Sequence, residues 1–314
     1  MQSLRIVGIS LLLFMGVFAF VLAFIGGPDY YAPRSYQYTW NLGHALAFFI
    51  WTYLCLFYFH KVNRLSFLEQ LCLFLIVSAV LGSGIEMIQS QIGRASNWND
   101  VINDVLGSML AVFLFSPQRH QITRTMLFLS SLILVFTIVA HNRGLVVVLI
   151  DDYHARQQFP VLADFSAPFE VSRWQGGSIV QIVLDSARPG DDILKIDFTT
   201  ERYSGVRLQH FPRDWQDYTA LQLEYYNPSE ESIYITCRIH DKTHVKGDQL
   251  YNDRFNRLIQ LHPGWHNFQI RIQDIVNAPM SRQMDINDIM ELGVFVSRQE
   301  HPQTLYISEV RLIR

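Results

Sequence analysis

Apolar residues are distributed along this chain in two different patterns, and the first pattern fills its N-terminal half. Residues 6–25 are apolar, and further apolar segments follow at roughly 42–59, 67–88, 100–115 and 126–140. A helix of 20 residues is about 30 Å long, which matches the hydrocarbon core of a bilayer. We therefore predict an α-helical membrane domain over residues 1–150 with about five transmembrane helices. Residues 29–40, which are rich in Tyr, are expected to form a loop, and residues 145–150 either extend the fifth helix or form the exit linker.

The second pattern begins near residue 160 and consists of short runs in which apolar and polar residues alternate. Nine runs have this character: IVQIVL, ILKIDF, GVRLQHF, LQLEYY, IYITCRI, RLIQL, WHNFQIRI, LGVFVS and LYISEVRLI. Such alternation is typical of strands with one buried face. About nine strands over residues 160–314 predict an all-β antiparallel sandwich. Only QDIV and DINDIM look helical, as turns between strands.

Charge separates the two halves in the same way. Residues 1–150 contain eight Lys and Arg and five Asp and Glu, whereas residues 151–314 contain 17 and 23, so the net charges are +3 and −6. An acidic second half without a basic run argues against a nucleic-acid partner.

The basic residues of the first half also predict its orientation. Five of them fall on one side of the membrane (Arg5, Lys61, Arg64, Arg119 and Arg124) and three on the other (Arg34, Arg94 and Arg143). The positive-inside bias then places the N-terminus in the cytoplasm. With an odd number of helices, the C-terminal domain is extracytoplasmic.

Polar residues interrupt the apolar segments between residues 82 and 107. Gly82, Glu86 and Gln89 form one helical stripe, and a second stripe contains Asp100, Asn103 and Gly107. A short connection that carries Arg94 makes the two segments an antiparallel hairpin, and the alternating topology adds His44 to the same face of the membrane. We therefore predict a ligand-binding cluster of His44, Glu86, Gln89, Arg94, Asp100 and Asn103.

Two interpretations of this cluster remain open. In the structural one, Glu86 and Arg94 pair to fasten the hairpin, Asn97 or Asn99 caps the next helix, and Asp100 lies in its first turn. In the functional one, His44 titrates near neutral pH, and Arg94 with the helix N-terminus binds an anion or phosphate. An ionisable group inside a membrane segment favours a function by default.

Several other kinds of chemistry lack a motif. His44, Glu86 and Asp100 have the chemistry of metal ligands but no close spacing such as HExxH, so no metal and no cofactor are expected. There is no GxSxG or Walker-type loop. Gly82 and Gly107 are interpreted as small residues for close helix packing. Asp104 lies one position from Asn103 and is expected to be a milder control position.

The residues of the cluster resemble the VanZ-like membrane family, named for a protein associated with resistance to glycopeptide antibiotics. The resemblance covers about residues 1–120. His44, Glu86, Gln89, Arg94, Asp100, Asn103 and Gly107 match the family's pattern, whereas Asn41 and Leu42 stand where Asp and Lys are expected.

Residues 234–312 contain RIHD, NDRFN, HPGWHNFQI, APMSRQMDINDI and LYISEVRL, and they resemble the galactose-binding-like jelly rolls of carbohydrate-binding modules. This resemblance implies a sugar or glycopolymer ligand. The loop residues Asp241, Asp253, Arg254 and Asn256 are candidate polar contacts, and Trp174, Trp215 or Trp265 could stack on a sugar. A calcium site at Asp241 or Asp253 stays open.

Together these features predict a multi-pass protein of the bacterial cytoplasmic membrane. Its partners are the lipid bilayer and an envelope glycan or lipid-linked precursor. One alternative is a membrane enzyme on a lipid-linked glycan, with Glu86 or Asp100 as base, His44 as acid and Arg94 on phosphate. The other is a scaffold or sensor that binds protein partners.

Overall fold

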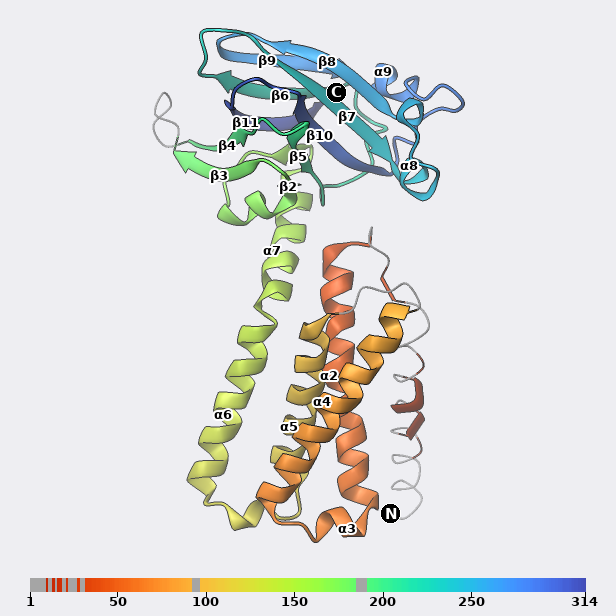
Figure 1. The fold of residues 1–314 in the computed structure, drawn as a ribbon, viewed down its shortest axis with the longest axis vertical. Coiled ribbons are helices and arrows are strands. Elements are labelled where there is room, and N and C mark those ends of the chain that lie inside the picture. Colours follow the sequence, from red (N-terminus) through yellow and green to blue (C-terminus); the bar gives the residue numbers. More distant parts are fainter. Residues whose placement is uncertain are drawn as a thin grey trace. The chain divides into compact units, whose positions relative to one another are not determined.

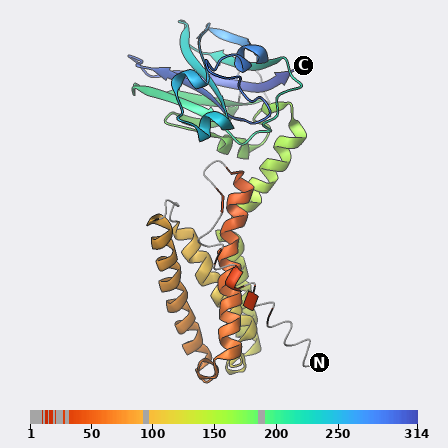
Figure 2. The ribbon, with the colours of Figure 1, turned by 90° about the vertical axis from the view of Figure 1, so that its right-hand side faces the viewer.

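The structure is a computed structural model, and it divides the chain into two compact units, up to Val148 and from Leu149 to Arg314. It describes residues 10, 13–14, 16–18, 21, 27–28, 32–91, 97–184 and 191–314. The first unit is helical and the second is built from β-sheets (Figures 1 and 2).

The helical unit contains four helices that are long and apolar enough to cross a membrane. The described helices are α2 (Arg34–Tyr58), α3 (His60–Asn63), α4 (Phe67–Gln91), α5 (Trp98–Phe115), η1 (Arg119–Gln121), α6 (Arg124–His141) and α7 (Arg143–Gln158). Four of the five expected apolar segments are therefore helices, and most of the first segment lies outside the described residues. The expected loop at residues 29–40 is wrong from Arg34 onward, because α2 begins directly after Pro33. No Gly or Pro lies between Arg34 and Leu42, so nothing in this part of the sequence stops a helix.

Close approach of the helices depends on two glycines. A Cβ atom on Gly107 would overlap the backbone carbonyl of Ala45 in α2, and one on Gly82 would lie 2.5 Å from the Asp104 carboxylate in α5. Helix α5 therefore packs tightly against both α2 and α4, as the sequence predicts for these small residues.

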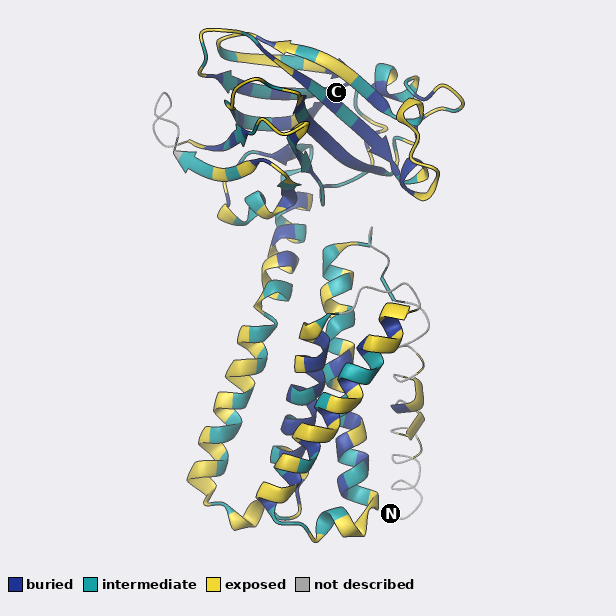
Figure 3. Ribbon diagram, in the orientation of Figure 1, coloured by how far each residue is buried: buried dark blue, intermediate teal, exposed yellow. Residues whose placement is uncertain are grey.

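Helix α6 presents apolar side chains to its surroundings. None of its residues is buried, although it carries Phe128, Leu132, Ile133 and Phe136. Figure 3 shows α6 in the colours of exposed and intermediate residues along its length. An apolar helix without a buried face is satisfied by lipid, which supports a membrane location.

The second unit is a sandwich of two antiparallel sheets, with a jelly-roll arrangement of strands. Its strands are β1 (Val161–Ala163), β2 (Trp174–Gly176), β3 (Ile179–Leu184), β4 (Asp192–Phe198), β5 (Tyr203–Leu208), β6 (Ala220–Asn227), β7 (Ile233–Asp241), β8 (Phe255–Leu261), β9 (Gly264–Arg271), β10 (Ile289–Ser297) and β11 (Gln303–Ile313). One sheet has the order β3-β4-β11-β6-β9, with β1 beside β11, and the other has the order β2-β5-β10-β7-β8.

The alternation in the sequence decides which side chains enter the sandwich. On β6, Leu221, Leu223 and Tyr225 are buried, and on β7 so are Ile233 and Ile235. These side chains meet between the sheets in one continuous core. All nine predicted runs are strands, and the predicted all-β sandwich is confirmed.

Shorter elements differ from the expectation. QDIV lies in α9 (Ile272–Val276), whereas DINDIM forms a turn that leads into β10. Three short helices were missed: η2 (Pro168–Arg173), α8 (Lys242–Lys246) and η3 (Tyr251–Asp253), together with β1 and β2.

The C-terminal part of α7 belongs to the β unit. The carboxylate of Asp151 pairs with the Arg173 guanidinium at 2.6 Å, and both side chains are almost completely buried. Glu170, also buried, lies 3.9 Å from the same guanidinium.

Candidate functional site

Three helices of the first unit bring polar side chains to one place. His44 from α2, Glu86 from α4 and Asp100 from α5 each offer one ligand atom, and these three atoms lie within 4.8 Å of one another. All three residues are buried, with exposures of 7%, 6% and 7%. The alternating topology predicts that these residues share a face, and the helix packing gathers them into one cluster.

Asp104 belongs to this cluster, although the sequence predicts only a milder control position there. Its side chain is fully buried, and Oδ1 lies 3.2 Å from Nδ1 of His44. It is therefore not a mild control position. Its spacing of four residues from Asp100 places both on one helix face, which is the sequence signal that could have revealed it.

Glu86 also holds the start of α5. Its Oε2 accepts a hydrogen bond from the backbone N–H of Asn97 at 2.6 Å, and Asn97 caps α5 by accepting from the N–H of Asn99. The other carboxylate oxygen, Oε1, is buried without a hydrogen-bond partner among the residues that the structure describes.

The remaining predicted members of the cluster have different surroundings. Asn103 donates to the Asn41 carbonyl oxygen at 3.4 Å and accepts from Asn142 at 3.0 Å, so it links α2, α5 and the end of α6. Gln89 is buried on the same face of α4 as Glu86. Arg94 lies outside the described residues, so its pairing with Glu86 stays a prediction.

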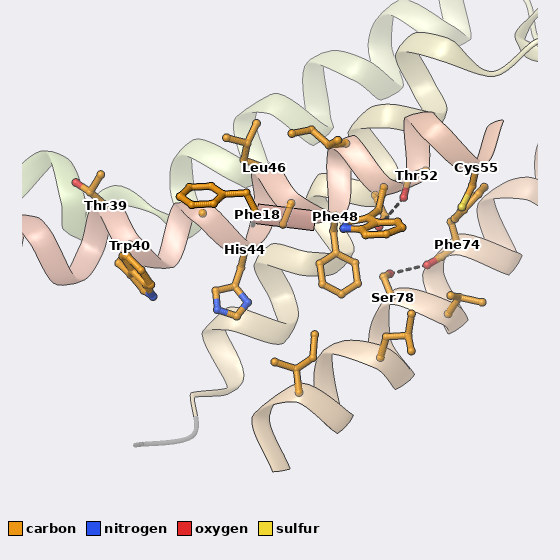
Figure 4. Close-up of a pocket in the computed structure, with 18 of the residues that line it drawn as sticks. Phe18, Thr39, Trp40, His44, Leu46, Phe48, Thr52, Cys55, Phe74 and Ser78 are labelled. Carbon is orange, nitrogen blue, oxygen red and sulfur yellow. Dashed lines mark hydrogen bonds between the residues drawn. The ribbon is translucent and has the colours of Figure 1, made fainter. Parts of the chain in front are cut away.

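A cavity of about 680 Å³ lies beside the cluster, between α2 and α4 (Figure 4). Its walls are mainly apolar or aromatic and include Trp40, Phe48, Trp51, Phe74, Val77 and Leu81. His44 is one of the few ionisable side chains in the lining, so the cavity adjoins the polar cluster at this residue.

In the sandwich, the predicted loop carboxylates form an internal network. The Arg282 guanidinium donates to Asp241 at 2.5 and 2.8 Å and to Asp253 at 2.6 and 3.0 Å. Asp241 also caps α8 through the N–H of His244. Hydrogen bonds from Arg282 lower the pKa of both carboxyls, against the opposing effect of burial. Both candidate calcium ligands are therefore engaged by a guanidinium.

Arg254 and Asn256 lie together near β8, the edge strand of the sheet β2-β5-β10-β7-β8. They line a shallow depression beside β8, together with Tyr251 and Met280. The Arg254 guanidinium lies over the Tyr251 ring at 5.6 Å, and Asn256 donates to the Tyr251 carbonyl oxygen at 2.9 Å.

The candidate tryptophans separate clearly by location. Trp174 and Trp215 are buried in the sandwich core, with exposures of 4% and 0%. Trp265 lies half-buried on β9, opposite Tyr226 of β6, and their ring centroids are 5.2 Å apart. Tyr226 in turn lies opposite Tyr306 of β11, with centroids 5.9 Å apart. We call Trp265, Tyr226 and Tyr306 the aromatic row.

The aromatic row lies on the outer face of its sheet, because Tyr226 has the opposite parity to the buried Leu221, Leu223 and Tyr225. Polar residues continue the same face. Lys195 pairs with Tyr306 in register and forms an ion pair of 2.9 Å with Asp197, and this hydrogen bond raises the pKa of the lysine. Sequence alternation identifies the outward positions, but only strand order places these three rings side by side.

No protein-family model and no curated protein matches this sequence, so the VanZ-like resemblance stays a prediction. Among solved structures, the family 11 carbohydrate-binding module from Clostridium thermocellum, in complex with a beta-1,3-1,4-mixed-linked tetrasaccharide, has a TM-score of 0.39. It is 16% identical, and the match covers 49% of this chain and 94% of that module. The family 30 module of the cellulase Cel9D-Cel44B from the same organism has a TM-score of 0.31 and 14% identity over 45% of this chain and 90% of the module. An exo-beta-agarase has a TM-score of 0.39 and 18% identity, over 48% of this chain and 24% of its own.

Proposed function

We propose that this chain is a membrane protein that binds a cell-envelope glycan on the outer face of the sheet β3-β4-β11-β6-β9. The observation that carries the proposal is the aromatic row. Its three rings come from adjacent strands and remain partly exposed, although large aromatic side chains are more stable when buried. A surface that keeps such rings accessible, with neighbouring centroids 5.2 and 5.9 Å apart, suits a flat ligand with apolar faces.

The polar neighbours of the aromatic row can provide the hydrogen bonds that a sugar ligand needs. Pyranose rings present C–H faces for stacking and hydroxyl groups around their edges, so a site needs aromatic platforms flanked by hydrogen-bonding groups. Lys195, Asp197 and Glu224 supply charged groups on this face, and Gln222 and Gln269 supply amides that already bond to each other at 2.8 Å. These side chains can exchange their mutual hydrogen bonds for bonds to hydroxyl groups.

The experiment uses the full-length protein in detergent and a panel of immobilised envelope polysaccharides. We expect Tyr226→Ala to weaken binding at least tenfold, because Tyr226 is the central ring and contacts both others. Trp265→Ala and Tyr306→Ala should each weaken it less. The matched control is Tyr234→Ala, since Tyr234 is an exposed tyrosine on the other sheet. Equal binding by the Tyr226→Ala protein and the wild type would refute this surface as the site.

A second candidate function concerns the helical unit, and the cavity between α2 and α4 favours it. Because these helices are long enough to span a bilayer, an apolar cavity between them is accessible to lipid chains. We propose that it holds the acyl or isoprenoid chain of a lipid whose polar head lies at the His44 cluster. A lipid-linked glycan has both parts.

Mass spectrometry of lipids that remain bound to the purified protein tests this second function. Ala47→Trp places a large side chain in the cavity lining and should remove the bound lipid. Leu75→Trp is the control, because Leu75 is exposed on α4 and does not line the cavity. An identical lipid content in both variants would contradict the proposed occupant.

A further inference from the structure

We infer that His44, Glu86 and Asp100 bind a divalent transition-metal ion, with Asp104 as the outer partner that orients the histidine. The inference is independent of glycan binding by the sandwich. It starts from the three ligand atoms within 4.8 Å of one another, which come from three different helices. The sequence predicts no metal here, because no close motif such as HExxH connects the three residues; they come together only in the folded helices.

The orientation of His44 supports the site. Nδ1 lies 3.2 Å from the Asp104 carboxylate, so an ionised Asp104 accepts a hydrogen bond from Nδ1–H, and the lone pair of the neutral ring is on Nε2. Nε2 lies on the side of Asp100, 4.0 Å from its Oδ2. A metal-binding histidine usually donates its second ring N–H to a carboxylate or a carbonyl group, which fixes the ring and the tautomer. His44 and Asp104 have this arrangement.

The position of Asp104 is itself built into the helix packing. Its carboxylate lies against Gly82 of α4, where any larger residue would displace it. The side chain is fully buried, and its second oxygen, Oδ2, lacks a hydrogen-bond partner among the described residues. A buried carboxylate in this position raises the affinity of His44 for a cation.

Glu86 supplies an independent indication of a ligand. The residue is 6% exposed, and its Oε1 is buried without a hydrogen-bond partner in the described part of the chain. Its Oε2 is held by the Asn97 N–H at 2.6 Å, so the carboxylate cannot rotate freely. A buried carboxylate oxygen without a partner is costly, and a bound cation removes that cost.

The ligand set indicates the kind of metal. One imidazole nitrogen and two carboxylates suit Zn²⁺, Mn²⁺, Fe²⁺ or Co²⁺, whereas Mg²⁺ and Ca²⁺ prefer oxygen alone. Bonds of about 2.1 Å in a tetrahedral site place ligand atoms about 3.4 Å apart. The three ligand atoms now lie within 4.8 Å of one another, so metal binding requires the side chains to move closer together. Three protein ligands leave a position for water or for an oxygen of a bound molecule.

The test uses the full-length protein in detergent, purified without a histidine tag, stripped with a chelator and titrated with Zn²⁺, Mn²⁺ or Co²⁺. We expect one equivalent of metal to remain after gel filtration. His44→Gln and Glu86→Gln should each reduce affinity more than 100-fold. Asp104→Asn should reduce it about 10- to 100-fold, the usual effect of losing an outer partner. Glu69→Gln is the matched control on α4, since Glu69 is exposed and bonds to Ser66.

X-ray absorption spectroscopy of the zinc-loaded wild-type protein identifies the atoms that bind the metal. It needs no variant, so it tests the site even if a variant fails to fold. Nitrogen and oxygen ligands with one imidazole support the site. Sulfur ligands, which would come from the cysteines, overturn it. The absence of tight stoichiometric binding also overturns it, as does metal binding that is unchanged in folded His44→Gln and Glu86→Gln proteins.

Discussion

Four buried carboxylates of the sandwich unit, Asp151, Glu170, Asp241 and Glu291, each form an ion pair with an arginine. In the helical unit, Glu86 and Asp104 are equally buried, but their described contacts are a backbone N–H and a histidine ring. An arginine satisfies a carboxylate permanently, because it stays charged and fills the remaining lone pairs. The carboxylates of the helical unit retain the capacity to bind a cation. The buried carboxylates of the sandwich thus stabilise its fold, whereas those of the helical unit are available to a ligand.

The largest expected effect is the loss of the arginine that joins two loops of the sandwich. Arg282→Met leaves Asp241 buried without its guanidinium, so we expect the free energy of unfolding to fall by about 3 to 5 kcal/mol. Urea unfolding of a fragment of residues 149–314 measures it. Arg271→Met is the control, because its pair with Asp274 is exposed to solvent and should contribute little to stability. Similar losses in both variants would show that Arg282 is an ordinary surface residue.

The next largest loss of stability is expected when the β unit is shortened at its N-terminal end. A fragment of residues 160–314 lacks Asp151 and leaves Arg173 buried with only the more distant Glu170. We expect it to be about 3 kcal/mol less stable than the fragment of residues 149–314. Asp151→Asn in the longer fragment should reproduce most of this loss. If both fragments unfold at the same urea concentration, the C-terminal part of α7 is not part of the β unit.

A smaller effect follows from His240 of β7. Burial, with help from Arg238, lowers the pKa of His240 to about 4. Between pH 6.5 and 4 the unfolded chain binds a proton that the folded sandwich does not, so stability decreases as the pH falls through this window. We expect a loss of about 2 kcal/mol between pH 7 and 5 from this residue.

His240→Gln should make the pH dependence of urea unfolding shallower. It should not abolish it, because burial also lowers the pKa of His244 and gives the same sign. An equally steep dependence in the variant would assign the effect to other groups.

The smallest effect on stability is expected for Glu86→Gln in the helical unit. Glu86→Gln keeps an oxygen for the Asn97 N–H and removes a buried charge, so we expect thermal unfolding without added metal to change by less than about 1 kcal/mol. The added stability from Zn²⁺ or Mn²⁺ should disappear in the same variant. A large loss in Glu86→Gln that Arg94→Gln partly recovers would instead support the fastening interpretation.

Local sequence determined most elements of this protein, because helices and strands bury side chains with different periods. The apolar segments are helices wherever the structure describes them, and the nine alternating runs are strands. The same periodicity placed Glu86 and Gln89 on one face of α4. These features depend on residues within a few positions of one another, so they are visible in the sequence.

Tertiary structure alone decided which residues meet. His44 and Asp104 are 60 residues apart, and Tyr226 and Tyr306 are neighbours only because β11 inserts between β4 and β6. Asp241 and Asp253 are candidates for ligand contacts in the sequence, but Arg282 occupies both of them after folding. The sequence does not distinguish one aspartate from another. Burial and the nearest charge in the folded protein decide whether a given carboxylate binds a ligand or stabilises the fold.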